Sequence, residues 1–192
     1  MRNRSFFGLI LTAVLLCGAG RLAGAELNRI IPEKSSIKFI YRQMNVPMEG
    51  SFSRYVSRLA FDPAKPAATS AMFDIDLGSI DTGATDADEE VRGKLWFNTK
   101  EFPRASFVST VIKPLSGNRF EVQGKLSMKG RTQDIVAPIS LSQEGGNSVF
   151  EGSFSINRAD FKIGEGMWAD FGTVANDIQI KVRLVASATP SR

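Results

Sequence analysis

The clearest pattern in the chain is an alternation of apolar and polar residues over positions 118–143. From Phe120 to Met128 apolar side chains and one glycine fill every second position, and Ile135 to Leu141 repeats this after Gly130. A period of two is typical of a β-strand with one buried face, and glycine permits the positive φ of a tight turn. The stretch therefore predicts an antiparallel hairpin, dry on one side and wet on the other.

The same alternation, with weaker regularity, predicts six more strands at about 36–43, 49–61, 72–77, 105–113, 148–157 and 177–184. Pro47 is expected to end the first of them or to begin the turn that follows. The stretch 49–61 has two less distinct faces, which indicates a bend or bulge near Gly50 or Ser57. A glycine-rich loop is expected over 158–174. With the hairpin, the chain has eight predicted strands.

One segment has a different period and predicts a single inserted α-helix at about 85–96. Ala87, Val91 and Leu95 recur at four-residue spacing, and acidic residues precede basic ones along the segment, as the helix dipole favours. Thr85 stands three residues before Asp88, which suggests a capping pair. The helix interrupts the strands after the third one.

Strands with one dry face must either pair in a sandwich or curl into a barrel. Eight strands can close into a barrel just wide enough for one small ligand. The pattern alone predicts an all-β antiparallel fold and leaves sandwich and barrel open.

The amino terminus predicts a secretory signal peptide over residues 1–25, cleaved after Ala25. Arg2 and Arg4 precede an apolar run from Phe6 to Cys17, and small residues follow before Glu26. Twelve apolar residues are too few to span a bilayer. We therefore expect a single secreted domain over 26–192, in the periplasm.

Removing this segment changes the charge and cysteine content. The chain has 24 basic and 20 acidic residues, and three arginines of the signal leave 21 basic residues and a net charge of +1. Nucleic-acid binding by a cationic surface therefore loses its support. Cys17 is the sole cysteine, so the secreted chain forms no disulfide of its own.

The residue types needed for common catalysis are missing. The chain has no histidine, and its cysteine lies in the signal, which excludes a histidine relay, a thiolate nucleophile and a soft-ligand zinc site. The acidic group Asp86, Asp88, Glu89 and Glu90 fits solvated residues at a helix start. We expect no enzyme activity, no catalytic cofactor and no metal site.

The candidate binding surface is the predicted dry interior, because its aromatic and branched side chains could line a chamber for an apolar ligand. A solid packed core would show the same alternation, and the pattern does not separate the two. The candidate residues are Phe39, Tyr41, Phe52, Phe73, Ile75, Phe107, Phe120, Val122, Ala137, Phe154, Ile156, Ile178 and Ile180.

Five segments resemble the YceI-like family of bacterial secreted lipid-binding proteins. They are 61–63 (FDP), 79–83 (SIDTG), 102–109 (FPRASFVS), 124–132 (GKLSMKGRT) and 157–164 (NRADFKIG), and the likeness spans most of residues 34–186. The resemblance implies an eight-stranded antiparallel lipocalin-like β-barrel that encloses a polyisoprenoid chain. The alternative from another class is a ligand-free periplasmic interaction or chaperone-like module with a packed core.

The chain also departs from that family at several positions. Gln43 stands where many members have histidine, 86–92 replaces an acidic-histidine motif, and Lys162 stands where glycine is common. Metal binding is therefore not carried over. The segment 164–168 (GEGMW) is similar to a branch that accompanies membrane b-type cytochromes, which implies a quinone such as ubiquinone as ligand and such a cytochrome as partner. A homodimer is an assembly that the sequence leaves open.

Overall fold

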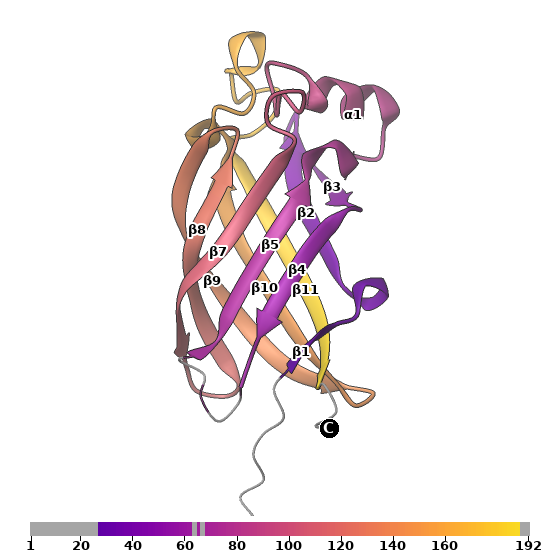
Figure 1. Ribbon diagram of the computed structural model, residues 1–192. Coiled ribbons are helices and arrows are strands. Elements are labelled where there is room, and N and C mark those ends of the chain that lie inside the picture. The colour runs from indigo at the N-terminus through magenta and orange to yellow at the C-terminus, as the bar shows by residue number, and fades with distance from the viewer. Residues whose placement is uncertain (1–26, 63–64, 66–67, 189–192) are drawn as a thin grey trace, which may run out of the picture.

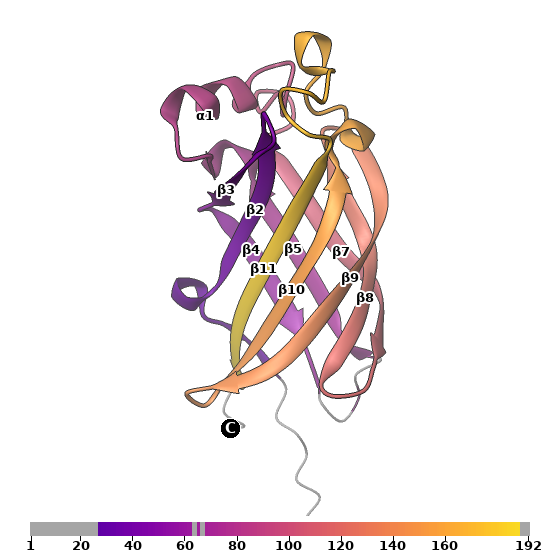
Figure 2. The same cartoon turned by 180° about the vertical axis from the view of Figure 1, so that it is seen from behind.

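An antiparallel sheet makes up most of the structure and curls around a buried interior (Figure 1 and Figure 2). The computed structural model describes residues 27–62, 65 and 68–188. The predicted signal peptide, its cleavage site and Glu26 lie outside the described residues. None of the helices in those ranges has the length and hydropathy of a membrane span.

The described residues form eleven strands rather than the eight predicted. The strands are β1 (Leu27–Ile30), β2 (Ser36–Gln43), β3 (Val46–Phe52), β4 (Tyr55–Ala60), β5 (Ser70–Asp76), β6 (Ile80–Asp81), β7 (Arg104–Pro114), β8 (Arg119–Met128), β9 (Arg131–Glu144), β10 (Asn147–Asn157) and β11 (Asp177–Ala188). The helices are α1 (Thr85–Arg92) and the short 3-10 turns η1 (Pro32–Lys34), η3 (Leu77–Ser79), η4 (Arg158–Phe161) and η5 (Gly166–Trp168).

The strands follow one continuous order, β4-β5-β7-β8-β9-β10-β11-β2-β3-β6, with β1 added on β11. β1 also reaches the β4 end of this order, because Leu27 and Phe61 exchange two backbone hydrogen bonds of 2.8 and 3.2 Å just beyond β4. The curled sheet thus approaches closure at the lower end of Figure 1. The prediction of an all-β antiparallel barrel with one helix is confirmed.

The predicted hairpin is present as β8 and β9. Lys129 and Gly130 form its two-residue turn with φ of 48° and 69°, and Met128 pairs with Arg131. The apolar positions of β8 are buried, whereas its polar positions are half-buried or exposed. A two-residue turn with positive φ matches the twist of the strands, which is why this hairpin was readable from the sequence.

The predicted strand 49–61 is wrong, because the chain turns a corner at Ser53 and Arg54 between β3 and β4. The Arg54 N–H donates to Ser79 Oγ at 3.0 Å, and the Arg54 carbonyl accepts the N–H of Asp76 at 3.0 Å. The loop that contains η3 therefore binds the corner. The bend lies between the two predicted sites, Gly50 and Ser57.

The first turn is also misplaced by the prediction. The chain reverses at Met44 and Asn45, both with positive φ, and Pro47 lies inside β3 opposite Arg42. β3 pairs with β6 only at Ser51 and Phe52, so Pro47 has no partner strand on the β6 side of β3. A proline is tolerated there because no ladder hydrogen bond is required.

The sequence analysis missed β1 and β6, because strands of four and two residues are too short for an alternation to be recognised.

The predicted helix 85–96 is too long by four residues. α1 ends at Arg92, and Gly93 donates its N–H to Glu90 O at 2.9 Å. The predicted capping pair is wrong as well, because Asp88 Oδ1 accepts the N–H and the hydroxyl of Thr82, each at 2.7 Å. Thr85 already lies within the first turn, so its side chain makes no cap.

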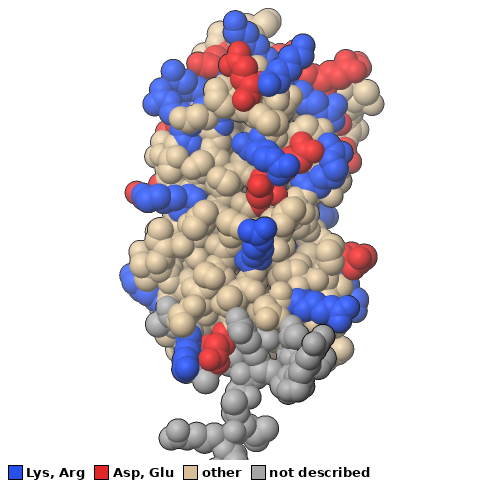
Figure 3. Space-filling model, in the orientation of Figure 1, with Lys and Arg blue, Asp and Glu red and all other residues tan. Residues whose placement is uncertain are grey.

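On the side of the barrel shown in Figure 3, basic and acidic side chains are interspersed. Opposite charges pair across neighbouring strands, for example Lys38 with Glu49 at 2.7 Å and Lys125 with Asp134 at 2.8 Å. Exposed pairs of this kind add little stability.

Candidate functional site

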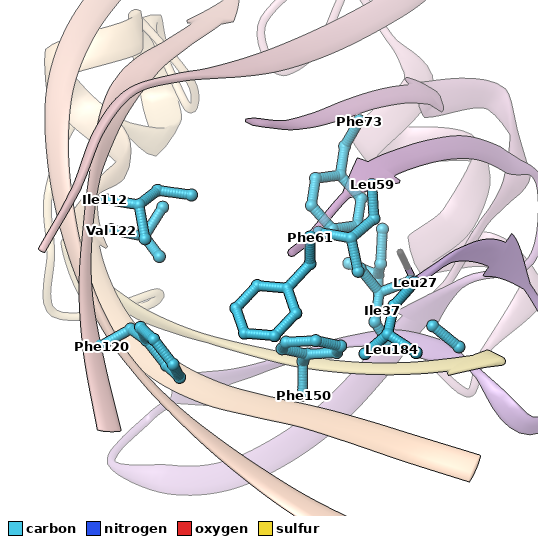
Figure 4. Packing of buried hydrophobic residues seen from close by; sticks show 11 residues of the cluster. Leu27, Ile37, Leu59, Phe61, Phe73, Ile112, Phe120, Val122, Phe150 and Leu184 are labelled. Atoms are coloured by element: carbon cyan, nitrogen blue, oxygen red, sulfur yellow. The ribbon is translucent and has the colours of Figure 1, made fainter. Parts of the chain in front are cut away.

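The interior of the barrel holds an apolar space of about 150 Å³, here called the inner cavity. Thr69 is the one polar side chain among its described lining residues. Figure 4 shows Ile112 and Val122 on one wall, facing Leu59 and Phe73 across the interior. An apolar cavity of this kind offers water no hydrogen-bond partners and suits hydrocarbon.

Aromatic rings close the floor of the inner cavity. The Phe61 ring lies 5.5 Å from that of Phe120 and 5.1 Å from that of Phe150, in edge-to-face geometry (Figure 4). Phe61 is held by its two backbone bonds to Leu27. Main-chain hydrogen bonds therefore anchor this aromatic floor to the sheet.

Two inward-facing glycines let large side chains of neighbouring strands lie flat along the wall. The Phe107 ring covers Gly124, and the Ile139 side chain covers Gly152. A Cβ at either glycine would collide with the covering side chain. At both positions the covering side chain therefore lies directly on the backbone and leaves the centre of the barrel open.

A second space of about 400 Å³, here called the outer cavity, lies under α1 and the loop between β10 and β11. Phe52, Met128, Ile156 and Ile180 line both cavities, so the two adjoin. Polar residues appear here, in contrast to the inner cavity. They are Tyr41, Gln43, Thr82, Asp86, Glu90 and Arg158.

The loop over the outer cavity is organised by Arg158, which is 2% exposed. Its guanidinium donates to six main-chain carbonyls of the loop that joins β10 to β11, at distances of 2.7 to 3.5 Å. The rings of Trp96 and Phe171 lie 5.3 and 5.0 Å from its central carbon. Burial lowers the pKa of Arg158, yet a guanidinium keeps its charge in proteins.

Further bonds fasten this loop to the rest of the barrel. Lys129, in the turn between β8 and β9, donates to Lys162 O at 2.6 Å and to Glu165 Oε2 at 3.0 Å. This hydrogen bond lowers the pKa of Glu165. Trp168 Nε1 donates to Glu90 Oε1 at 2.8 Å, which ties the loop to α1. The upper end is therefore closed by loops that side chains hold in place.

Trp96 and Tyr41 both line the outer cavity, and each side chain carries a neutral hydrogen-bond donor. Trp96 is 7% exposed, and its Nε1 has no hydrogen-bond partner among the described residues. The Tyr41 hydroxyl makes a long bond of 3.4 Å to Thr82 O. Burial, and then the charge of Asp88, raises the pKa of Tyr41, so it stays a protonated phenol. Trp96 lines the cavity with other atoms, because its Nε1 is itself buried.

All thirteen candidate residues of the sequence analysis line one cavity or the other. Ten line the inner cavity, whereas Phe39, Tyr41 and Ile178 line only the outer one. That they contact a ligand stays a prediction.

Other residues of the site were missed by reasoning from alternation. Trp96 lies in the turn after α1, and Arg158 begins a 3-10 turn, so neither belongs to an alternating strand. The only signal for Arg158 was its position in the segment 157–164 that resembles the family.

Asp86 and Glu90 are exposed at the rim of the outer cavity. Within the described ranges, no group of three acidic, histidine or cysteine side chains could hold a metal ion.

The fold thus has an apolar barrel interior, one helix beside the mouth of the barrel and a long loop before the last strand. The sequence matches a family model. The model of the YceI-like domain matches residues 29–186. The chain belongs to the YceI-like family. It is similar to a UPF0312 protein of Yersinia pestis (strain Pestoides F), with 26% identity over 94% of this chain and 95% of the relative. A UPF0312 protein of Photorhabdus laumondii is 27% identical over 96% of this chain and 97% of its own.

Solved structures share the YceI-like fold. BcnA of Burkholderia cenocepacia has a TM-score of 0.79 and 40% identity, covering 82% of this chain and 99% of BcnA. A YceI protein of Campylobacter jejuni has a TM-score of 0.66 and 21% identity, covering 73% and 85%. A polyisoprenoid-binding domain from Saccharophagus degradans has a TM-score of 0.64 and 16% identity, covering 86% and 99%. The last two show the fold alone.

Proposed function

We propose that this YceI-like protein is a periplasmic lipid-binding protein that encloses a polyisoprenoid chain in its barrel. The observation that carries the proposal is the pair of adjoining cavities, because the inner one is lined almost wholly by apolar side chains. Burial of a hydrocarbon chain stabilises a complex by about 0.8 kcal/mol for each methylene group. The neighbour from Saccharophagus degradans, whose name states polyisoprenoid binding, has the same fold and supports this choice.

The cavities favour a chamber over the alternative of a ligand-free module with a packed core. Protein interiors normally pack as densely as organic crystals. A residual cavity of about 150 Å³ costs roughly 3 to 4 kcal/mol of stability when it is empty. A protein without a ligand would gain by filling this space with side chains. The binding role is therefore the better supported one.

The finer parts of the proposal rest on the resemblance. A quinone such as ubiquinone is the proposed ligand, and a membrane b-type cytochrome is the proposed partner, because the segment 164–168 is similar to the branch that accompanies such cytochromes. That segment lies in the loop over the outer cavity, where a head group would lie. The roles we propose are transport, storage or sequestration of the lipid, without catalysis. Whether the protein is a monomer or a homodimer can be measured on the same purified material.

Organic extraction of the purified secreted protein tests the binding role. We expect mass spectrometry of the extract to show an isoprenoid lipid at close to one molecule per chain, because the adjoining cavities form one chamber. An unrelated periplasmic protein, purified in the same way, serves as control for lipid carried over from the membrane. An extract with no more isoprenoid than this control would contradict the proposal.

Processing tests the proposed location. The secreted protein is expected to begin at Glu26, because Ala23 and Ala25 provide the small residues that the signal peptidase requires. Intact-mass measurement of the periplasmic fraction checks this expectation. Retention of Met1, or a lipid attached to Cys17, would show that the segment acts as an anchor instead.

A further inference from the structure

The cavity side of β3 ends in apolar side chains that are exposed. Met48 of β3 lies opposite Tyr41 of β2, and Val46 lies opposite the next residue but one, Gln43. Residues directly opposite each other on paired strands point to the same side of the sheet. The two β2 residues line the outer cavity, whereas Met48 and Val46 are 39% and 56% exposed and line neither cavity. The wall of the outer cavity therefore continues onto the surface as apolar side chains.

The loop between β10 and β11 adds further exposed apolar side chains at the same end of the barrel. Met167 is 82% exposed and Phe171 is 46% exposed, and Met44, in the turn between β2 and β3, is 75% exposed. The Met44 N–H donates to Thr173 O at 2.8 Å, which ties this turn to the loop. Both segments lie at the upper end of the barrel in Figure 1 and Figure 2. We define the apolar patch as Met44, Val46, Met48, Met167 and Phe171.

The loop part of the apolar patch also adjoins the outer cavity. Trp168, which directly follows Met167, lines that cavity. The Phe171 ring lies 5.0 Å from the central carbon of Arg158, which lines it as well. The patch thus meets the cavity both along β3 and along the loop. A lipid that enters or leaves between these two segments passes over the patch.

A contiguous exposed apolar surface marks a site of contact with a protein or a membrane, whereas scattered apolar residues are normal. On the outer face, Val108 of β7 and Val136 of β9 are exposed but separated by β8, whose Lys125 and Gln123 lie opposite them. The apolar patch has no such separation at the joined turn and loop.

The charged side chains beside the apolar patch have both signs. Arg42 precedes the β2–β3 turn and Asp170 precedes Phe171, and both are exposed. A surface with mixed charge at its border and apolar side chains at its centre fits an apolar partner better than an ion of one sign.

We propose that the apolar patch docks on the surface of a lipid bilayer, with the mouth of the barrel against the membrane. The proposal rests on the proposed function, because an isoprenoid tail dissolves in membranes and each methylene group lowers its solubility in water by roughly fourfold. Docking lets the tail pass from the bilayer into the cavity without entering water. It also buries the exposed side chains in the interfacial layer, where apolar groups of membrane-bound proteins lie.

Flotation of the purified secreted protein with phosphatidylcholine vesicles, which carry no net charge, tests the docking. We expect the protein to float with the vesicles and to remain bound at high salt, because apolar contact is not screened. Replacing Met44 and Met167 together with glutamine keeps the length of both side chains and removes their apolar character. The partition coefficient should fall at least tenfold. The unfolding midpoint should not change, because both side chains are exposed.

The matched control replaces Val108 and Val136 together with glutamine. These two side chains are 48% and 54% exposed on the outer face, away from the patch, so this variant should bind vesicles as the parent does. A parent protein that does not float, or two double variants that float equally, would overturn the docking. So would a parent that ignores vesicles and sediments as a dimer that the Met44→Gln and Met167→Gln changes dissociate, because the patch would then join two copies of the chain.

A fluorescent label shows which end of the barrel meets the membrane. The chain has one cysteine, in the predicted signal peptide, so Met167→Cys gives the secreted protein a single site for an environment-sensitive dye. Its emission should shift to the blue on phosphatidylcholine vesicles, whereas the same dye on Val136→Cys should not respond. Equal responses at the two sites would contradict the proposed orientation.

Lipid extraction keeps this proposal apart from the proposed function, because vesicle binding is measured without regard to the contents of the barrel. Absence of isoprenoid in the extract contradicts the proposed function. Isoprenoid in the extract of a protein that does not bind vesicles contradicts the docking alone.

Discussion

Replacing Arg158 with methionine should lower the free energy of unfolding by roughly 3 to 5 kcal/mol. Methionine keeps much of the apolar volume but removes every donor of a side chain that is 2% exposed. Six main-chain carbonyls then lose their partner in the loop over the outer cavity. A buried carbonyl left without a donor costs much more than an ordinary hydrogen bond contributes. We expect the loop to lose its fixed shape and bound lipid to escape faster.

Urea denaturation followed by circular dichroism measures this effect, and Arg183→Met is its matched control. Arg183 makes two shorter contacts of 2.6 Å, to Glu144 and Glu151, but lies on the outer face of the barrel. Because exposed ion pairs contribute little, the control should leave the midpoint nearly unchanged. If both variants shift the midpoint equally, burial of Arg158 is not what makes it important.

Replacing Ala137 with phenylalanine should remove the bound lipid while the barrel still folds. Ala137 is 4% exposed and lines the inner cavity opposite Val122. A phenylalanine at this position would extend into the space that the tail is proposed to occupy. In a solid core the same substitution would overpack the interior and cost about 1 to 3 kcal/mol. Loss of lipid without such a cost is therefore the signature of a chamber.

Val136→Phe is the matched control, since Val136 is the preceding residue of β9 and is 54% exposed on the outer face. Mass spectrometry of extracts should show at least tenfold less isoprenoid in Ala137→Phe than in Val136→Phe, and thermal unfolding should give similar midpoints. A sharp fall in the midpoint of Ala137→Phe, with no isoprenoid in the parent protein, would contradict the chamber and favour a packed core.

The sequence predicts the long strands well because their alternation is enforced by one dry and one wet face. The hairpin of β8 and β9 has the predicted faces and the predicted turn at Gly130. The corner at Ser53 was not predictable in the same way, because residues on both sides of it belong to strands and the partner that bends the chain, Ser79, comes 26 positions later. Tertiary hydrogen bonds, not local preference, decide where β3 ends.

The lining of the site was partly predictable for the same reason. Inward-facing strand residues such as Phe73 and Ile156 follow from the period of two, and they line the inner cavity. Trp96 and Arg158 belong to turns, where no period indicates which side chain points inward. The existence of a cavity also depends on how side chains pack, and alternation is the same for a filled and a hollow barrel.

The glycines under Phe107 and Ile139 have a consequence for which molecules fit. At Gly124 and Gly152 the backbone itself forms the wall, so the covering side chains recede from the centre of the barrel. An alanine at either position would push its cover toward the axis and shorten the free path along it. The absence of a side chain at these two positions thus helps to set the length of tail that fits. Related chains with larger residues there would accept shorter tails.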